Sequence, residues 1–372
     1  MLTPLEVLTR ALRPAGGGVY VVSTGVAEQQ ALQRRIYGAP TAEAIDDRWR
    51  AALSRLPAAR AVLLGVPSDC GAGFTRGANR APAALRGHLL DARSHAMWAE
   101  DVVDAGDVRV VPHLLSEEML SAEQIIASRH ALFGDDPRAA HLPVSPLGLT
   151  SAALEALFAL APDAVPVLIG GDHSVAWPAF AAAHAHWEKH RGRRLGLLHF
   201  DAHTDLLAER LGVKYCFATW AWHANVLLGA DGRLVQVGVR ASGHPAAHWE
   251  KLCNLRQIRA PEALARGAAA LADEIIERFT RLGVDALYVS NDIDGTDPAF
   301  AAATGTPEPG GLDPDLVSDL TRRVAARFPL VGGDLVEVAP PLAHEVPGEP
   351  AMTLDTSARY LGDLLALAGA AR

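Results

Sequence analysis

One stretch constrains the fold of this chain most: residues 194–205, which read Arg-Leu-Gly-Leu-Leu-His-Phe-Asp-Ala-His-Thr-Asp. The apolar run at its start predicts a buried strand, and Asp201, His203 and Asp205 then follow at every second position. Side chains two apart on an extended segment share a face, so two carboxylates and an imidazole emerge together where the strand ends. Desolvated like charges repel one another, and a bound divalent cation would remove that cost. Taken alone, the segment is also compatible with a helix-capping turn that carries scattered polar residues.

Length and composition exclude several classes of protein. The 372-residue chain is 49% hydrophobic, which is ample for a core, yet no apolar run approaches the roughly 20 residues that span a bilayer. Its first residues do not read as a signal peptide. The three cysteines lie far apart without a Cys-x-x-Cys pair, which fits a reducing cytoplasm and indicates neither a disulfide framework nor a structural zinc site. A net charge of -9 without a basic cluster argues against a nucleic-acid partner. We therefore expect a cytoplasmic protein without membrane or nucleic-acid partners.

Predicted strands and helices alternate over most of the chain. Apolar runs indicate strands near residues 61–66, 165–169, 194–200, 234–239, 286–290 and 330–338, with helices near 151–161, 261–282, 313–328 and 356–367 between or after them. Such alternation predicts a mainly parallel sheet covered by helices on both faces. We expect a single domain over residues 59–372, preceded by an N-terminal extension, residues 1–58, that lies outside the sheet. Sites in such sheets lie beyond the carboxyl ends of the strands.

Two further strand ends carry residues that bind metals. Residues 170–174 read Gly-Gly-Asp-His-Ser and supply His173, and residues 291–298 supply Asp292 and Asp294, which share a face by the same spacing of two. With the first segment, this makes two imidazoles and four carboxylates, whose charge balances two divalent cations and leaves a bridging water free to ionise. Ligands rich in carboxylate and free of thiolate favour a hard metal such as manganese over a structural zinc. Two metals about 3.5–4 Å apart would generate a hydroxide nucleophile near neutral pH.

These three segments also resemble the signatures of the ureohydrolases, the family of arginase, agmatinase and other guanidino-compound hydrolases. The resemblance covers about residues 60–370 and implies a three-layer α/β/α sandwich, an arginase-like fold, that binds two Mn2+ ions (Ni2+ is possible) and assembles as a homo-oligomer, a trimer or hexamer. It implies that a metal-bridging hydroxide cleaves a small guanidino compound to urea and an amine. Carried over residue by residue, the metal ligands are His173, Asp201, His203, Asp205, Asp292 and Asp294.

The resemblance also assigns a substrate side to the site. Glu337, within residues 334–340, matches the glutamate that binds the guanidinium, and a fixed carboxylate suits a planar cation that donates paired hydrogen bonds. Thr306 lies in residues 304–308, which resemble the loop on the substrate side. A surface acid at a strand end is the alternative for Glu337.

Two departures from the family pattern bear on substrate and proton transfer. Leu207 stands where arginases tend to place an asparagine that holds the amino-acid end of arginine, so we expect agmatine or a guanidino acid rather than L-arginine. The family's proton-shuttling loop histidine is absent, and Cys216 lies near its expected place. His223 is the nearest histidine and our candidate for the acid if residues 214–222 turn back, whereas Asp205 could take the proton from the bridging water alone.

Three alternatives are also compatible with the sequence. The chain could be an L-arginase of the same family, or a non-catalytic ureohydrolase-like subunit that kept the fold. The run Asp-Ile-Asp-Gly-Thr from Asp292 onward also matches the nucleophile motif of haloacid-dehalogenase-type phosphatases, which would make Asp292 a phosphorylated nucleophile beside magnesium. That last alternative leaves the segments of His173 and His203 without a role.

Overall fold

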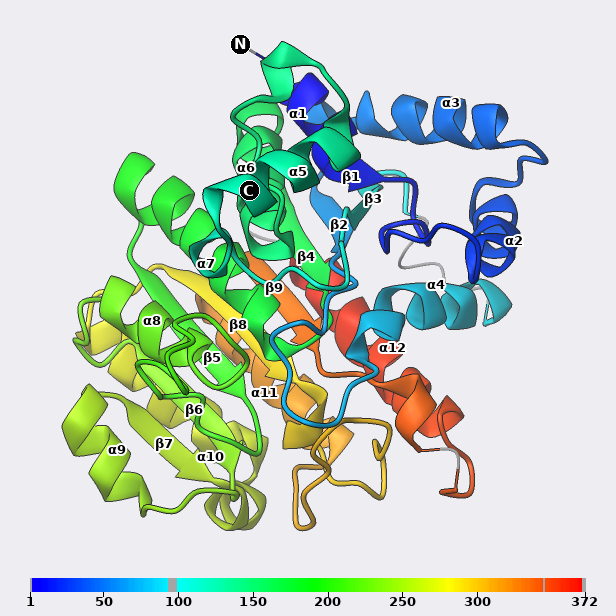
Figure 1. Cartoon of the computed structure of the whole chain (residues 1–372). Helices are drawn as coiled ribbons and strands as arrows, with labels where there is room; N and C mark the ends of the chain where they lie inside the picture. The colour runs from blue at the N-terminus through cyan, green and yellow to red at the C-terminus, as the bar shows by residue number, and fades with distance from the viewer. Residues whose placement is uncertain (1, 93–98, 344, 370–372) are drawn as a thin grey trace.

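The computed structural model describes residues 2–92, 99–343 and 345–369, and a nine-stranded sheet runs through its centre (Figure 1). The strand order is β1-β3-β2-β4-β9-β8-β5-β6-β7, and every neighbouring pair is parallel except β1 with β3. The strands are β1 (Leu12–Arg13), β2 (Ala61–Gly65), β3 (Val102–Val108), β4 (Val165–Ile169), β5 (Leu195–Phe200), β6 (Leu234–Val239), β7 (Arg256–Arg259), β8 (Ala286–Asp292) and β9 (Leu330–Val336).

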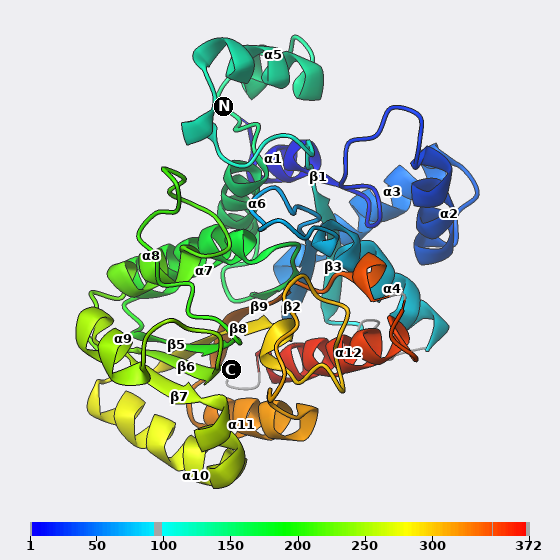
Figure 2. The same cartoon turned by 60° about the horizontal axis from the view of Figure 1, so that its bottom comes forward.

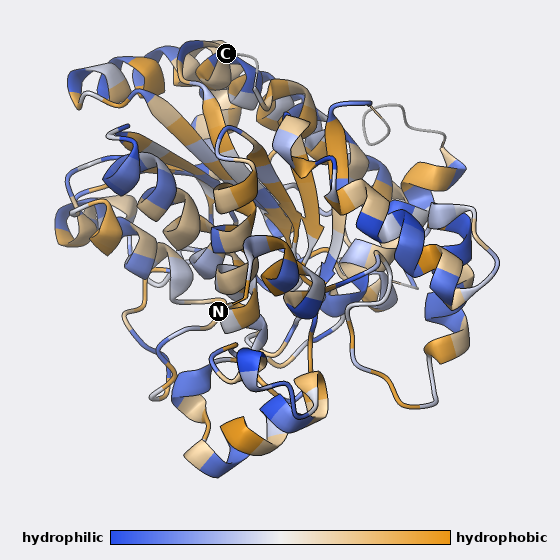
Figure 3. Cartoon of the chain, turned by 90° about the horizontal axis from the view of Figure 1, so that it is seen from above, coloured by the Kyte–Doolittle hydropathy of each residue, from blue (hydrophilic) through white to orange (hydrophobic). Residues whose placement is uncertain are grey.

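Helices cover both faces of the sheet, so the predicted three-layer α/β/α sandwich is confirmed (Figure 2). One face packs on α1 (Pro4–Ala11), α3 (Ala42–Leu53), α6 (Pro146–Leu160), α7 (Ala176–Ala183), α8 (Trp220–Leu227) and α9 (Ala246–Cys253). The other face packs on α4 (Ala81–Asp91), α10 (Ala260–Arg281), α11 (Pro314–Arg327) and α12 (Ala351–Leu367). Figure 3 shows apolar strands between these layers. None of the helices in the described residues is long and apolar enough to cross a membrane.

Successive side chains of β5 pack alternately into the cores on the two faces of the sheet. Leu195 and Leu197 belong to the core beneath α6 and α7, whereas Leu198 and Phe200 belong to the core beneath α10 and α11. Successive side chains of a strand point to opposite faces, so an apolar run without alternation is the pattern of a strand buried on both sides. His199 lies on the first face, where it interrupts the apolar surface with a buried polar ring.

The expectation that residues 1–58 lie outside the sheet is wrong. Leu12 and Arg13 form β1, the edge strand antiparallel to β3, and the indole N–H of Trp49 donates to the Ala105 carbonyl at 2.8 Å. Leu8, Leu12 and Trp49 are fully buried in the core of the first face. A strand of two residues is too short to show a hydrophobic period, which is why the pattern of the sequence missed it. Of the other outlying helices, α2 (Val26–Tyr37) buries none of its residues, and α5 (Ala122–Phe133) contributes to a small separate cluster.

The topology brings the three ligand-bearing segments to one edge. β4, β9, β8 and β5 are neighbours in the sheet and run parallel, so their carboxyl ends meet. Short 3-10 turns follow two of them, His173–Val175 after β4 and Ile293–Gly295 after β8. Close backbone approach is needed here, because a Cβ on Gly171 would lie 1.7 Å from the Ser68 carbonyl oxygen of the loop after β2. The site therefore lies where the predicted topology places it.

Candidate metal centre

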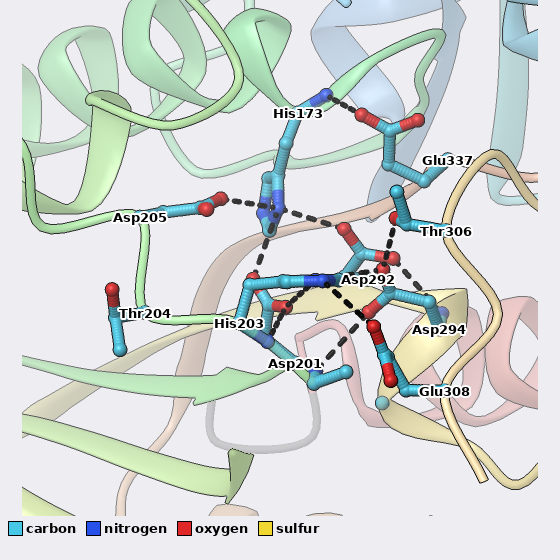
Figure 4. Close-up of polar contacts among 12 residues, drawn as sticks. His173, Asp201, His203, Thr204, Asp205, Asp292, Asp294, Thr306, Glu308 and Glu337 are labelled. Atoms are coloured by element: carbon cyan, nitrogen blue, oxygen red, sulfur yellow. Dashed lines mark hydrogen bonds and ion pairs between the residues drawn. The ribbon is translucent and has the colours of Figure 1, made fainter. Parts of the chain in front are cut away.

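His173 forms the first half of the cluster. Its Nδ1 atom lies 3.1 Å from Asp205 Oδ2, 3.1 Å from Asp292 Oδ2 and 3.4 Å from Asp201 Oδ2 (Figure 4). All four side chains are buried, and they come from the ends of β4, β5 and β8. The carboxylates of Asp201, Asp205 and Asp292 thus converge on His173 Nδ1.

His203 forms the second half. Its Nδ1 atom lies 3.0 Å from Asp294 Oδ2 and 3.4 Å from Asp201 Oδ1. Asp201 therefore faces both histidines, one with each carboxylate oxygen. The structure brings together all the predicted ligands, in two groups that share Asp201.

Backbone amides at the strand ends hold these carboxylates in position. Asp201 Oδ1 accepts from the His203 amide at 2.6 Å, and Asp292 Oδ1 accepts from the Asp294 amide at 2.9 Å. These are turns in which an aspartate captures the amide two residues on, a local bond that ends a strand without further help. Asp294 Oδ1 in turn accepts from the Ala202 amide at 3.1 Å and so joins the two segments. The spacing of two residues between acids thus serves both the turn and the cluster.

A chain of three hydrogen bonds orients the His173 ring. Ser290 Oγ donates to Asp334 Oδ1 at 2.7 Å, and the Tyr288 hydroxyl donates to Asp334 Oδ2 at 2.8 Å. Since the only proton of Ser290 is used, its oxygen accepts from His173 Nε2, which lies 3.0 Å away. The proton of a neutral ring is therefore on Nε2, and the lone pair of Nδ1 faces the carboxylates.

The electrostatics of the cluster favour a cation over protons. Burial raises the pKa of Asp292 well above its usual value, and the charges of Asp294 and Asp201 raise it further. Burial alone would lower the pKa of His203, but Asp201 and Asp294 raise it to about 12. Burial likewise opposes the charged form of His173, and its carboxylate neighbours outweigh burial and raise its pKa well above normal. A divalent ion can take the place of each such proton, because metal ligands bind deprotonated.

The residues present fit a pair of divalent ions. His173 Nδ1 is fully buried and makes no hydrogen bond of acceptable geometry within the described residues, although carboxylate oxygens surround it. Oxygen and imidazole donors without a thiolate are the set that hard or borderline metals prefer. The shared carboxylate of Asp201 between two groups of donors is the arrangement that two neighbouring ions require.

The predicted substrate residues lie beside this cluster. Glu337 follows β9 with a φ of 61°, and its Oε1 accepts from the His173 amide at 2.9 Å. Burial and the nearby charge of Asp172 raise the pKa of Glu337 well above its usual range, so this carboxylate would be stabilised by a cation. Thr306 donates its hydroxyl to Asp294 Oδ2 at 2.9 Å. Both residues are placed at the site, and their roles toward a substrate stay predictions.

Arg240 ties the loop of Thr306 to the cluster. Its Nη2 donates to the carbonyls of Asp294 at 2.7 Å, Glu308 at 2.6 Å and Thr296 at 3.3 Å. A Cβ on Gly311 would lie 2.6 Å from the same nitrogen, so the absence of a side chain there leaves room for the guanidinium. Glu308, held in this way, places Oε1 3.9 Å from His203 Nε2 (Figure 4).

The proton-transfer candidates differ in their surroundings. Residues 214–219 turn back before α8 begins, but the described contacts of His223 are with Tyr215, Trp177 and the Lys214 carbonyl rather than with the cluster. Cys216 is buried, and burial raises the pKa of its thiol. Asp205 belongs to the cluster itself. The role of His223 as the acid stays a prediction.

Two neighbours of the ligands escaped the sequence analysis. His199 Nε2 lies 2.9 Å from Asp201 Oδ2, and the indole N–H of Trp220 donates to Asp205 Oδ2 at 3.1 Å. The Trp220 ring is fully buried and also stacks on His173, with ring centroids 4.6 Å apart. The spacing of two that identified Asp201 and His203 extends back to His199 and was the available signal.

Fold and site together define a class: an α/β sandwich in which histidine and aspartate side chains at the carboxyl ends of the strands form two groups that could each hold a metal ion. The sequence profile of the arginase family matches residues 59–365, and the chain belongs to that family. The predicted resemblance is thereby confirmed, and the phosphatase alternative is wrong.

The chain is also similar to individual hydrolases in sequence and in structure. The chain is 30% identical over 299 residues to a guanidinobutyrase of Pseudomonas aeruginosa, covering 77% of this chain and 81% of the relative. It is 32% identical over 295 residues to the proclavaminate amidinohydrolase of Streptomyces clavuligerus, covering 76% and 81%. The solved structure of that amidinohydrolase superimposes with a TM-score of 0.64 at 27% identity, covering 85% of this chain and 95% of that one.

Proposed function

We propose that this protein hydrolyses a guanidino compound to urea and an amine. The observation that carries the proposal is the Asp201 carboxylate between two groups of metal donors, with Glu337 bonded to the backbone of ligand His173. Two ions in this site would lower the pKa of a bound water to near neutrality and supply the nucleophile. Membership of the arginase family and the similarity to a guanidinobutyrase support the same chemistry.

Glu337 would bind the guanidinium. The His173 amide holds Oε1 in place, so the carboxylate is oriented before a ligand arrives. A planar cation with paired N–H donors matches a carboxylate and removes the cost of its buried charge. Thr306, fixed by its bond to Asp294, would contact the substrate from the facing loop.

The substrate tail would be that of agmatine or a guanidino acid rather than of L-arginine. Leu207, at the position where arginases tend to have an asparagine, is 41% exposed, and its side chain offers neither a donor nor an acceptor. A carboxylate and ammonium on one carbon would gain little there. The name of the relative from Pseudomonas aeruginosa points to a guanidino acid, and we adopt that class as the first to test.

The leaving amine requires a proton. Asp205 would take the proton of the nucleophilic water, because it belongs to the cluster. His223 would deliver a proton to the amine, which requires its ring to leave the Lys214 carbonyl that it contacts at 3.0 Å. Burial lowers the pKa of His223, so the protonated ring is a stronger acid but a smaller fraction of the rings carries that proton at neutral pH.

Manganese is the metal we propose, with nickel as the second choice, because carboxylate-rich sites suit hard ions. We further propose that residues 59–372 form the catalytic unit and that residues 1–58 are an N-terminal extension that packs on it; residues 93–98, 344 and 370–372 of that unit lie outside the described part. A cytoplasmic homo-oligomer, a trimer or hexamer, completes the proposal.

Urea release tests the function. The chelator-stripped protein is loaded with manganese or, separately, with nickel, and assayed with 4-guanidinobutyrate, 3-guanidinopropionate, agmatine and L-arginine. We expect the highest kcat/KM on a compound other than L-arginine. Highest efficiency on L-arginine would make the chain an arginase, and no urea from any substrate at full metal loading would identify a non-catalytic member of the family.

A further inference from the structure

A row of buried polar side chains crosses the sheet one layer beneath the metal centre. Asp334 on β9 pairs in register with Ser290 on β8, and Ser290 with His199 on β5. His199 pairs with Gln236 on β6, and Gln236 with Gln257 on β7. All five side chains are fully buried in the parallel sheet, whose core is otherwise dominated by apolar residues. A polar row in such a core is costly unless each group is bonded, so its bonds are informative.

The half of the row on β5, β6 and β7 forms a directional chain of hydrogen bonds. Gln257 Nε2 donates to Gln236 Oε1 at 2.9 Å. Gln236 Nε2 lies 3.0 Å from His199 Nδ1, and only an unprotonated Nδ1 can accept from it. The ring proton is therefore on Nε2, which donates to Asp201 Oδ2 at 2.9 Å. The chain starts two strands away and ends on the carboxylate shared by both halves of the metal centre.

Gln236 also contacts the loop that carries the predicted ligands His203 and Asp205. Its Nε2 also donates at 2.7 Å to the carbonyl of Thr204, the residue between ligands His203 and Asp205 (Figure 4). The amide thus holds the backbone of one ligand-bearing loop and, through His199, the side chain of Asp201. Both links act on residues that must converge on the ions.

His199 is not itself a metal ligand in this arrangement. Its Nδ1 accepts from Gln236 and its Nε2 donates to Asp201, so neither ring nitrogen has a lone pair directed at the centre. Carboxylates that bind metals are commonly oriented by outer partners of this kind, and loss of such a partner typically costs about 10–100-fold in metal affinity or activity.

We propose that His199 is a positioning residue, held by Gln236 and Gln257, that orients Asp201 for metal binding. It takes no part in proton transfer or substrate contact. The proposal concerns metal retention alone, so it stands or falls independently of which guanidino compound the enzyme hydrolyses.

Manganese binding to the chelator-stripped full chain tests the proposal, by titration calorimetry with MnCl2 and by the electron paramagnetic resonance spectrum of the bound ions. In His199→Phe, which keeps a ring and removes both nitrogens, we expect the affinity for at least one ion to fall about 10–100-fold. The KM for substrate at saturating manganese should stay unchanged, because the ring does not face the substrate side. His199→Gln, whose amide can still donate to Asp201, should recover part of the affinity.

A matched control is His184→Phe, which alters another buried histidine, next to Glu188 on the helix that follows α7. This variant should bind manganese like the wild type. If His199→Phe does not fold, as judged by circular dichroism, Gln236→Leu takes its place, because it leaves the His199 ring intact and removes all three hydrogen bonds of the Gln236 side chain. Wild-type manganese affinity in the folded variant, or an equal loss in His184→Phe, would overturn the proposal.

Discussion

Ser290→Ala removes the hydroxyl that joins His173 to Asp334, and we expect it to lower both stability and metal affinity. The hydroxyl accepts from His173 Nε2 at 3.0 Å and donates to Asp334 Oδ1 at 2.7 Å, and all three side chains are fully buried. Each buried group left without its partner costs about 1–3 kcal/mol, so two groups together give about 2–6 kcal/mol. Tyr288 still donates to the second oxygen of Asp334, which places the expected loss in the lower half of that range.

The assay is urea denaturation of the metal-free protein followed by circular dichroism, with manganese titration of the same preparation. The freed His173 ring should also lower metal affinity by about 10–100-fold. Ser318→Ala is the control, because its hydroxyl is equally buried and has no hydrogen-bond partner among the described residues. That control removes a buried hydroxyl that has no partner to lose, so it should not lower the free energy of unfolding. If Ser290→Ala matches Ser318→Ala in both measurements, the hydroxyl does not orient His173 and the reasoning is refuted.

Three further predictions concern the ligands and the proton donor. Asp292→Ala and His203→Ala should each abolish urea release and weaken manganese retention while the circular dichroism spectrum stays that of the folded sheet; retained activity in either would remove that residue from the ligand set. Carboxylates raise the pKa values of His173 and His203, and burial with neighbouring charges raises that of Asp292, so the metal-free cluster holds protons that an ion must displace. Manganese affinity should therefore rise with pH, and binding at pH 7 should release protons, measurable by calorimetry in buffers of different ionisation enthalpy; affinity that is independent of pH would contradict this. His223→Ala should lose at least about tenfold in kcat at saturating metal and Cys216→Ala much less, whereas a His223→Ala enzyme that keeps more than about a tenth of wild-type turnover rules out the role.

The clustering of the six predicted ligands could be foreseen from the sequence because it follows from local geometry. Acids two residues apart share a face of an extended segment, and the carboxyl ends of parallel strands meet at one edge. The spacing of two residues is enough to predict that Asp201 and His203 lie together. The meeting of the carboxyl ends of parallel strands is enough to predict that Asp294 joins them. The sheet itself was predictable for the same reason, since its long apolar strands are buried on both faces.

What the sequence did not reveal depends on contacts between distant segments. β1 is formed because Leu12 meets Val108 across the edge, and a two-residue strand carries no period of its own. The role of His199 becomes visible only when Gln236 is its neighbour on the next strand. The place of His223 depends on how residues 214–219 turn, and the structure directs its ring at the Lys214 carbonyl.

The number of manganese ions bound per chain tests the central claim most directly. The chelator-stripped protein is saturated with MnCl2, freed of loose metal by gel filtration and analysed by mass spectrometry of the elements. The geometry of the cluster predicts two ions per chain in the wild type, and the loss of both in Asp201→Ala, because that carboxylate faces both groups of donors. Fewer than one ion per wild-type chain, or two ions retained by Asp201→Ala, would contradict the binuclear centre.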